Sequence, residues 1–150
     1  MTTLYRYYLR FFLYCIGLAL LCGLLSVFLP LALKGILTIF PFLLALILVL
    51  YHFLKLEKRA PTTQETQRFA IGYVLIFWFY NLLGMLISIA FFAQEDPTLW
   101  QTVGQYVSEP KFLLTAAGMV LLLSIPMYLV TWWFYGPQAA RMAKVMFKPK

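Results

Sequence analysis

Side chains that could carry out chemistry are few in this chain, and most lie in apolar surroundings. There is one histidine, His52, and there are two cysteines, Cys15 and Cys22. A single histidine excludes a bis-histidine haem site within one chain. The cysteines are seven residues apart and share a helix face, but they lack the Cys-x-x-Cys spacing of metal and redox sites. We therefore expect structural thiols, no metal, no cofactor and no enzymatic activity.

Charged residues are also missing from four apolar runs, which extend over residues 11–29, 36–54, 69–93 and 112–135. A charged side chain inside a bilayer is costly and usually marks an ion pathway or a coupling site. This absence argues against a small proton-coupled antiporter, which needs a carboxylate at membrane depth. Neither a Ser/His pair nor paired aspartates are available for intramembrane proteolysis.

The composition places the chain in lipid and not in water. Apolar residues make up 63% of the chain and charged residues only 11%, whereas about a quarter of a soluble domain is charged. Each apolar run is long enough to cross about 30 Å of hydrocarbon as a helix. We therefore predict an all-α membrane protein, a single domain of residues 1–150 that forms a bundle of four transmembrane helices.

The basic residues are distributed unevenly along the chain. Ten of the twelve Lys and Arg residues lie in the N-terminal segment, in the stretch between the second and third runs, or in the tail. The loop between the third and fourth runs instead holds Glu95, Asp96 and Glu109. By the positive-inside rule, both termini and the central stretch lie in the cytoplasm. We expect a multi-pass protein of the bacterial inner membrane.

The same basic residues are the candidate binding site. Near a membrane surface each can contribute roughly 1 kcal/mol of attraction to anionic headgroups. An acidic partner protein, in a larger membrane complex or a homo-oligomer, could use the same face, whereas nucleic acid is not expected. The candidate lipid- or partner-binding residues are Lys55, Lys58, Arg59, Arg68, Arg141, Lys144 and Lys148.

Local signals predict where several helices begin and end. Pro61 cannot continue the helix of the second run. Thr62 and Glu65 have the spacing of a capping box, which starts the next helix. Pro30, followed by residues 34–35, predicts a tight turn between the first two runs. Pro41 would then lie in the first turns of the second helix, where proline is tolerated.

Two shorter helices are predicted outside the apolar runs. Asp96 and Pro97 can start a short helix in the third loop, with Trp100, Val103 and Tyr106 on one face, and we expect it to lie in the membrane interface. The tail from residue 136 predicts an amphipathic basic helix beginning at Pro137, with Ala139, Met142, Ala143 and Met146 on its apolar side.

Small and weakly polar residues recur at helical spacing within three runs. They comprise Cys15, Ala19, Cys22 and Ser26 in the first run, Asn81, Gly84 and Ser88 in the third, and Ala117, Ser124 and Thr131 in the fourth. Such residues let helices approach and form hydrogen bonds between them in lipid. We expect Asn81, Gly84, Ser88 and Ser124 to form a helix-packing polar face, with Asn81 bonded to another helix. The alternative is a small cavity with Asn81 as its most polar wall.

The fourth run carries two further signals. Pro126 should kink its helix and free the carbonyl of Leu122, with Ser124 near enough to help satisfy it. Residues 132–135 are four consecutive aromatic side chains, which is typical of an aromatic belt at the membrane surface.

Arg59, Pro61, Thr62 and Glu65 form an Arg-x-Pro-Thr-x-x-Glu motif between the second and third runs. With this motif and the four-run layout, the chain resembles an uncharacterised family of small four-pass bacterial inner-membrane proteins. The resemblance covers the hydropathy layout of the whole chain and implies no particular activity.

These observations favour a non-enzymatic membrane protein, an accessory, stabilising or regulatory subunit of a larger assembly. The alternative is a small oligomeric transporter or pore, of the efflux or holin-like kind. The missing membrane carboxylate argues against proton-coupled export, but it leaves a passive pore open.

The charge distribution predicts the topology. Reporter fusions after Arg59 and after Lys150 should both report the cytoplasm, because basic residues flank the runs on that side. A fusion after Thr102 should report the opposite side. A cytoplasmic signal at Thr102 would contradict four membrane crossings.

Overall fold

The computed structural model describes residues 2–28, 30–96 and 98–147, and within them every regular element is helical. Four segments are long and apolar enough to cross a membrane: Leu4–Ser26, Ile39–Glu57, Thr63–Phe92 and Pro110–Met146. The prediction of an all-α chain with four long apolar helices is confirmed. In order, the elements are α1 (Thr2–Ser26), α2 (Leu31–Glu57), α3 (Thr63–Phe92), α4 (Thr98–Ser108), α5 (Pro110–Trp133), the π-helical segment η1 (Phe134–Gln138) and α6 (Ala139–Met146).

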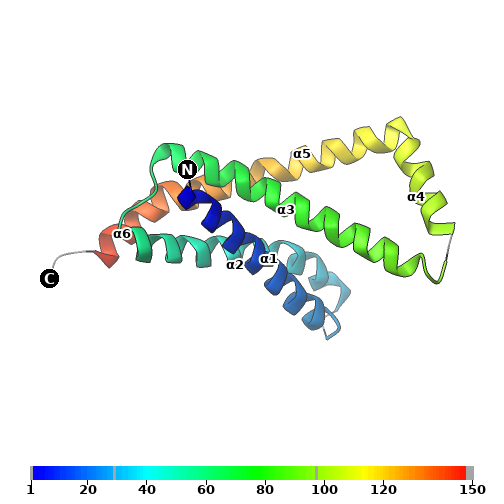
Figure 1. The fold of residues 1–150 in the computed structure, drawn as a ribbon, viewed down its shortest axis with the longest axis horizontal. Coiled ribbons are helices and arrows are strands. Elements are labelled where there is room, and N and C mark those ends of the chain that lie inside the picture. The colour runs from blue at the N-terminus through cyan, green and yellow to red at the C-terminus, as the bar shows by residue number, and fades with distance from the viewer. Residues whose placement is uncertain (1, 29, 97, 148–150) are drawn as a thin grey trace.

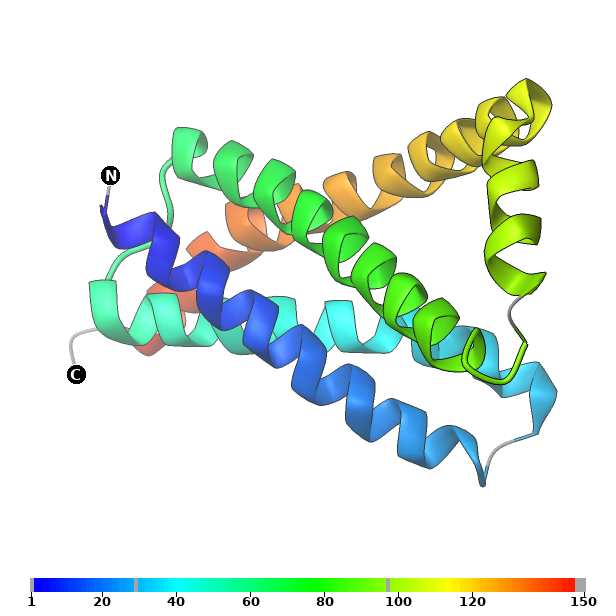
Figure 2. The same ribbon diagram turned by 45° about the vertical axis from the view of Figure 1, so that its right-hand side comes forward.

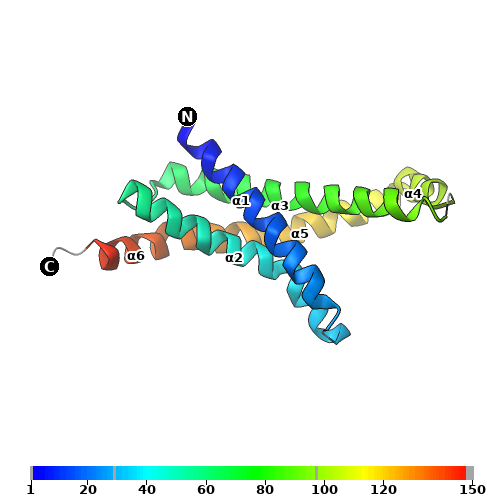
Figure 3. The same ribbon diagram turned by 60° about the horizontal axis from the view of Figure 1, so that its bottom comes forward.

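The start of α1, the helix α6 and the loop between α2 and α3 lie together at one end of the molecule, which we call the loop end (Figure 1). The short helix α4 lies at the opposite end and joins α3 to α5. Two further views show α1 and α2 leaving the loop end at an angle to α3 and α5 (Figure 2, Figure 3). The long helices therefore pack together at the loop end and splay apart beyond it.

The junction between α2 and α3 follows the local sequence signals. α2 ends at Glu57, and Lys58 turns the chain in the left-handed region with φ 51°. The Thr62 hydroxyl accepts from the Glu65 amide at 3.3 Å, while the Glu65 carboxylate accepts from the Thr62 amide at 2.8 Å. The predicted capping box is confirmed, and with it the start of α3.

Two predictions about the start of the second helix are wrong. α2 begins at Leu31, directly after the extended residue Pro30, so Lys34 and Gly35 lie inside a helix and not in a turn. Pro41 is consequently more than two turns into α2, so it removes an internal hydrogen bond. α1 covers Thr2–Ser26, so the helix starts before the first apolar run does. A helix with enough packed neighbours can continue through a glycine or a proline that would end it in isolation.

The predicted break before the tail is also absent. Pro137 does not start a separate helix but lies within η1, which connects α5 to α6 without interruption. Proline has no amide hydrogen, so the carbonyl of Trp133 cannot receive the usual bond from four residues ahead. The local widening into a π-helical turn accommodates this missing donor.

The two predicted short helices are present. α4 covers Thr98–Ser108, and the Asp96 carboxylate accepts from the Thr98 amide at 3.0 Å before its start. Pro97 lies outside the described residues. α6 is the predicted tail helix, with Ala139 buried and Met142 and Ala143 packed against the core.

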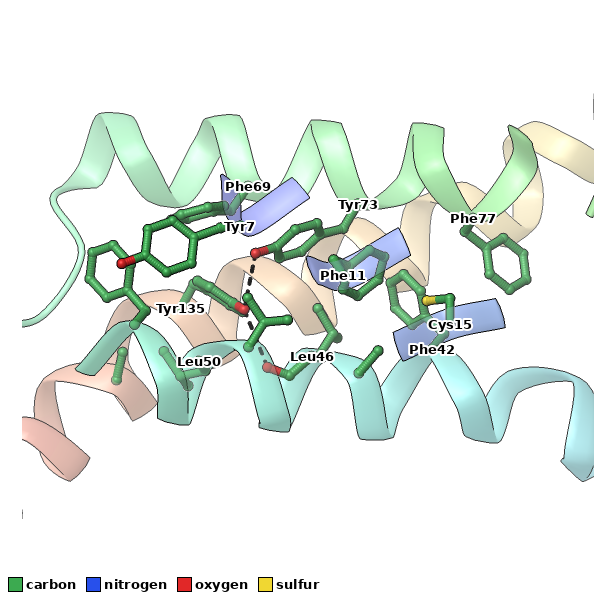
Figure 4. Close-up of a cluster of buried hydrophobic side chains, with 14 of the residues drawn as sticks. Tyr7, Phe11, Cys15, Phe42, Leu46, Leu50, Phe69, Tyr73, Phe77 and Tyr135 are labelled. Carbon is green, nitrogen blue, oxygen red and sulfur yellow. Dashed lines mark hydrogen bonds between the residues drawn. The ribbon is translucent and has the colours of Figure 1, made fainter. Parts of the chain in front are cut away.

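Aromatic side chains from several helices form the core at the loop end (Figure 4). Phe11 of α1 stacks on Tyr73 of α3, with ring centroids 4.0 Å apart. Phe69 stacks on the same tyrosine at 5.4 Å. Phe42 of α2 meets Phe11 edge-on at 5.6 Å. Cys15 is fully buried in this core, so its thiol has a packing role.

Helix α1 is held against α3 at a glycine. A Cβ atom at Gly72 would overlap the ring of Tyr8, so only glycine leaves room for this side chain. The Tyr8 hydroxyl then donates to the backbone carbonyl of Arg68 at 2.8 Å. The contact fixes the crossing of α1 over the first turns of α3.

Tyr135 was predicted to belong to an aromatic belt, but it is fully buried in the core. Its hydroxyl donates to the backbone carbonyl of Leu46 at 3.2 Å and lies 3.2 Å from the hydroxyl of Tyr73 (Figure 4). The Thr66 hydroxyl donates to the backbone carbonyl of Tyr135 at 3.1 Å. Tyr135 therefore bonds both α2 and α3, whereas Trp132 and Trp133 remain exposed.

The buried bond from Thr66 should contribute measurably to stability. Thr66→Val keeps the side-chain shape but leaves the Tyr135 carbonyl without this donor, so we expect a loss of about 1–2 kcal/mol in unfolding free energy. Thermal unfolding in detergent measures it. Thr115→Val is the matched control, because Thr115 is exposed and bonds only within its own helix. Equal effects of both substitutions would contradict the assigned role.

Candidate functional site

Arg59 is the candidate binding residue with the most defined surroundings. Its guanidinium donates to both oxygens of Glu65, at 2.8 and 2.9 Å, and lies 3.8 Å from the Glu57 carboxylate. It also sits 5.6 Å from the centre of the Phe53 ring. The hydrogen bonds to Glu65 raise the pKa of Arg59 above its usual value. Arg59, which was predicted to bind lipid or a partner, is therefore already paired with Glu65 and Glu57 of its own chain.

The four residues of the Arg-x-Pro-Thr-x-x-Glu motif form one structural unit. Pro61 lies directly before the cap, three residues after Lys58 has ended α2. Thr62 caps α3, and Glu65 both completes the cap and receives the guanidinium of Arg59. Tyr7 of α1 adds a bond from its hydroxyl to Glu57 at 3.3 Å. The unit closes the loop between α2 and α3, a structural role for the motif.

The other candidate basic residues are at the loop end as well. Lys55, Lys58 and Arg68 are exposed around the α2–α3 junction. Arg141 and Lys144 are exposed on α6. Lys148 lies outside the described residues. The structure therefore brings five exposed cations from two distant parts of the sequence to one end of the molecule (Figure 1).

The bond from Asn81 to another helix, expected as part of the helix-packing polar face, is not found among the described residues. Asn81 donates to the carbonyl of Phe77 at 2.8 Å, which is a bond within α3 and not to another helix. A Cβ at Gly84 would meet no atom within 4 Å, and Ser88 is exposed and bonds to the Gly84 carbonyl. The ribbon of α3 diverges from that of α5 toward the α4 end (Figure 2), and the open space around Gly84 agrees with this splaying.

Ser124 does connect two helices. The indole nitrogen of Trp78 on α3 donates to the Ser124 hydroxyl on α5 at 2.8 Å. Ser124 in turn donates to the carbonyl of Val120 at 2.6 Å, and not to the carbonyl of Leu122 that Pro126 was expected to free. Trp78 was not singled out in the sequence. Its signal is an indole N–H within an apolar run, which needs an acceptor when buried.

Asn81 borders two cavities. A cavity at Asn81 was the alternative to the helix-packing polar face. The larger, of about 470 Å³, lies between α2, α3 and α5 and is lined by apolar residues that include Phe42, Phe77 and Met127. The second, of about 330 Å³, lies against α1, where Ala19 and Cys22 face it. The apolar lining of the larger cavity suits hydrocarbon chains and gives an ion few ligands, whereas Ser26, Tyr80 and Asn81 add polar groups to the second.

No group of three or more His, Cys, Asp or Glu residues that could hold a metal ion occurs in the described ranges, 2–28, 30–96 and 98–147. Comparisons with protein families, curated proteins and solved structures found no match.

The bond between Trp78 and Ser124 can be tested with a closely matched pair of substitutions. Ser124→Ala removes the acceptor of an interhelical bond, so we expect a loss of roughly 0.5–1.5 kcal/mol in stability. Ser88→Ala should change stability by less, because Ser88 has the same bond to a carbonyl four residues back but no partner on another helix. Unfolding in detergent compares the two. A larger effect at Ser88 would contradict the assignment.

Proposed function

We propose that this chain is a non-enzymatic, multi-pass protein of the bacterial inner membrane that acts as an accessory or stabilising subunit of a larger assembly. The observation that carries the proposal is the exposure of two apolar segments, residues 82–92 of α3 and 111–123 of α5. Almost every residue in both is exposed, with Ile89 and Ala116 half-buried. We call these two segments the open half.

The open half is suited to receive further helices. Lipid can cover apolar side chains, but helices in a bilayer are held together by close packing and not by a hydrophobic driving force. In the open half, Gly84 and Ser88 of α3 and Gly118 of α5 present small surfaces with space around them. Helices of a partner could pack against these positions more closely than lipid tails do.

The charges support an orientation for this proposal. The loop end carries most of the exposed cations, while the opposite end carries the exposed carboxylates of Glu95, Asp96 and Glu109 together with Lys111. With the loop end in the cytoplasm, the molecule obeys the positive-inside rule. The helix α4 would then lie at the far membrane surface, where its exposed Trp100 and Tyr106 suit the interface.

The resemblance to small four-pass inner-membrane proteins fits this proposal, because the Arg59–Glu65 unit shapes the loop that faces the cytoplasm. An oligomeric pore or efflux carrier is the second candidate. The same exposed faces favour it, since they could pair with further copies of the chain. The larger cavity at Asn81 is lined mainly by apolar residues, so we expect a passage for polar solutes to form between copies.

Extraction in a gentle detergent followed by mass analysis distinguishes these assemblies. For an accessory subunit we expect a complex heavier than the 17.4 kDa chain that contains a different protein. Multiples of the chain mass would support the oligomeric carrier. A species of one chain alone would contradict both.

Photo-crosslinking from two positions of α3 tests whether the partner contacts the open half, with the second position as the matched control. Ile87 in the open half and Leu75 nearer the loop end are 61% and 63% exposed and lie on the same helix. We expect a protein adduct from position 87 and lipid adducts from position 75. Protein adducts of equal yield from both would place the partner elsewhere.

A further inference from the structure

A groove between α2 and α6 lies at the loop end, apart from the cavities at Asn81. Its volume is about 570 Å³, and it is lined by Tyr51, Gln138, Arg141, Met142, Val145 and Met146. It exists because η1 carries the chain past Pro137 and sets α6 beside α2. The buried Ala139 holds α6 in place, while Val145 stays 77% exposed on the outer side.

The charge of this groove distinguishes it from a second cavity at the loop end, which is more polar. That cavity, of about 280 Å³, holds Arg59 and Arg68 together with Glu57 and Glu65, so its charges balance. The residues that line the α2–α6 groove include one cation, Arg141, and no carboxylate. In the described part of the chain both ion pairs involve Arg59, so none engages Arg141.

The remaining groups divide the groove into a polar and an apolar part. The hydroxyl of Tyr51 and the amide of Gln138 can donate hydrogen bonds beside Arg141. Met142, Val145, Met146 and the ring of Tyr51 offer an apolar surface. Lys55 follows Tyr51 by one helical turn, so it lies on the same face of α2 and adds positive charge.

We propose that the α2–α6 groove binds one anionic phospholipid from the leaflet at the loop end. The Arg141 guanidinium would pair with the phosphate, since its planar donors match phosphate oxygens in a bidentate manner. Tyr51 and Gln138 donate to the headgroup or ester oxygens, and the methionines contact an acyl chain. This inference rests on the membrane location and orientation given under Proposed function.

Native mass spectrometry of the full chain in detergent, titrated with phosphatidylglycerol or phosphatidylcholine, tests the site. We expect one tightly bound phosphatidylglycerol, and about tenfold weaker binding for Arg141→Gln, because a charge-assisted hydrogen bond is lost. Arg6→Gln is the matched control, since Arg6 is exposed at the same end but lies outside the groove, and it should bind like the wild type.

A second variant keeps the test informative if Arg141→Gln unfolds. Val145→Glu places a carboxylate on an exposed position of the groove, so it should weaken phosphatidylglycerol binding and leave the thermal unfolding temperature unchanged. Equal loss in Arg6→Gln, equal affinity for both lipids, or a bound second copy in place of lipid would each overturn the proposal.

The failure of this site is separable from the failure of the proposed function. Reporter fusions and the mass of the extracted complex test the orientation and the partner, and neither depends on Arg141. Loss of the lipid site with an intact complex would refute only the present inference. Inverted reporter signals would refute the orientation on which it rests.

Discussion

The position of Tyr135 is the constraint on which the arrangement of the long helices depends. Its hydroxyl and its backbone carbonyl bond to groups on both α2 and α3, namely the carbonyl of Leu46, the hydroxyl of Tyr73 and the hydroxyl of Thr66. Polar groups buried in hydrocarbon have no water to replace a lost partner, so a set of mutually satisfied bonds holds helices in one register. Tyr135 is in η1, and η1 exists because Pro137 lacks an amide hydrogen. A local defect in one helix thus places the side chain that ties it to two others.

The contrast between the packed loop end and the open half follows from side-chain type. Rings such as Phe11, Phe69 and Tyr73 make large stacked contacts, and aromatic pairs contribute beyond the area they bury. Beyond Asn81 the helices carry mainly aliphatic and small side chains, which gain little over lipid tails. Trp78 and Ser124 supply the interhelical hydrogen bond nearest to that boundary. The helices are therefore closely packed at the loop end, where their own side chains fill the core. In the open half, a further helix could complete the packing.

Features decided within one or two helical turns could be predicted from the sequence, and features decided between helices could not. The capping box of Thr62 and Glu65 is local, and so are the apolar runs that define the four long helices. Pro137 was read as a helix start because its neighbours in space were unknown. The same limit applies to Tyr135, since nothing in the sequence ranks it above Trp132 for burial. Asn81 was expected to bond across helices, but a bond needs an acceptor in reach, and splayed helices offer none except its own backbone.

The charge at the loop end is also a property of the fold and not of composition. Counted along the sequence, the central stretch and the tail appear equally basic. In the structure, Arg59 is paired with Glu57 and Glu65, while Lys55, Lys58 and Arg68 stay exposed around the same junction. No such pair engages Arg141 among the described residues, and η1 carries it to the side of α2. An anionic headgroup is attracted to cations that the protein has not already paired, and Arg141 is such a cation in a groove that also offers an apolar wall to an acyl chain.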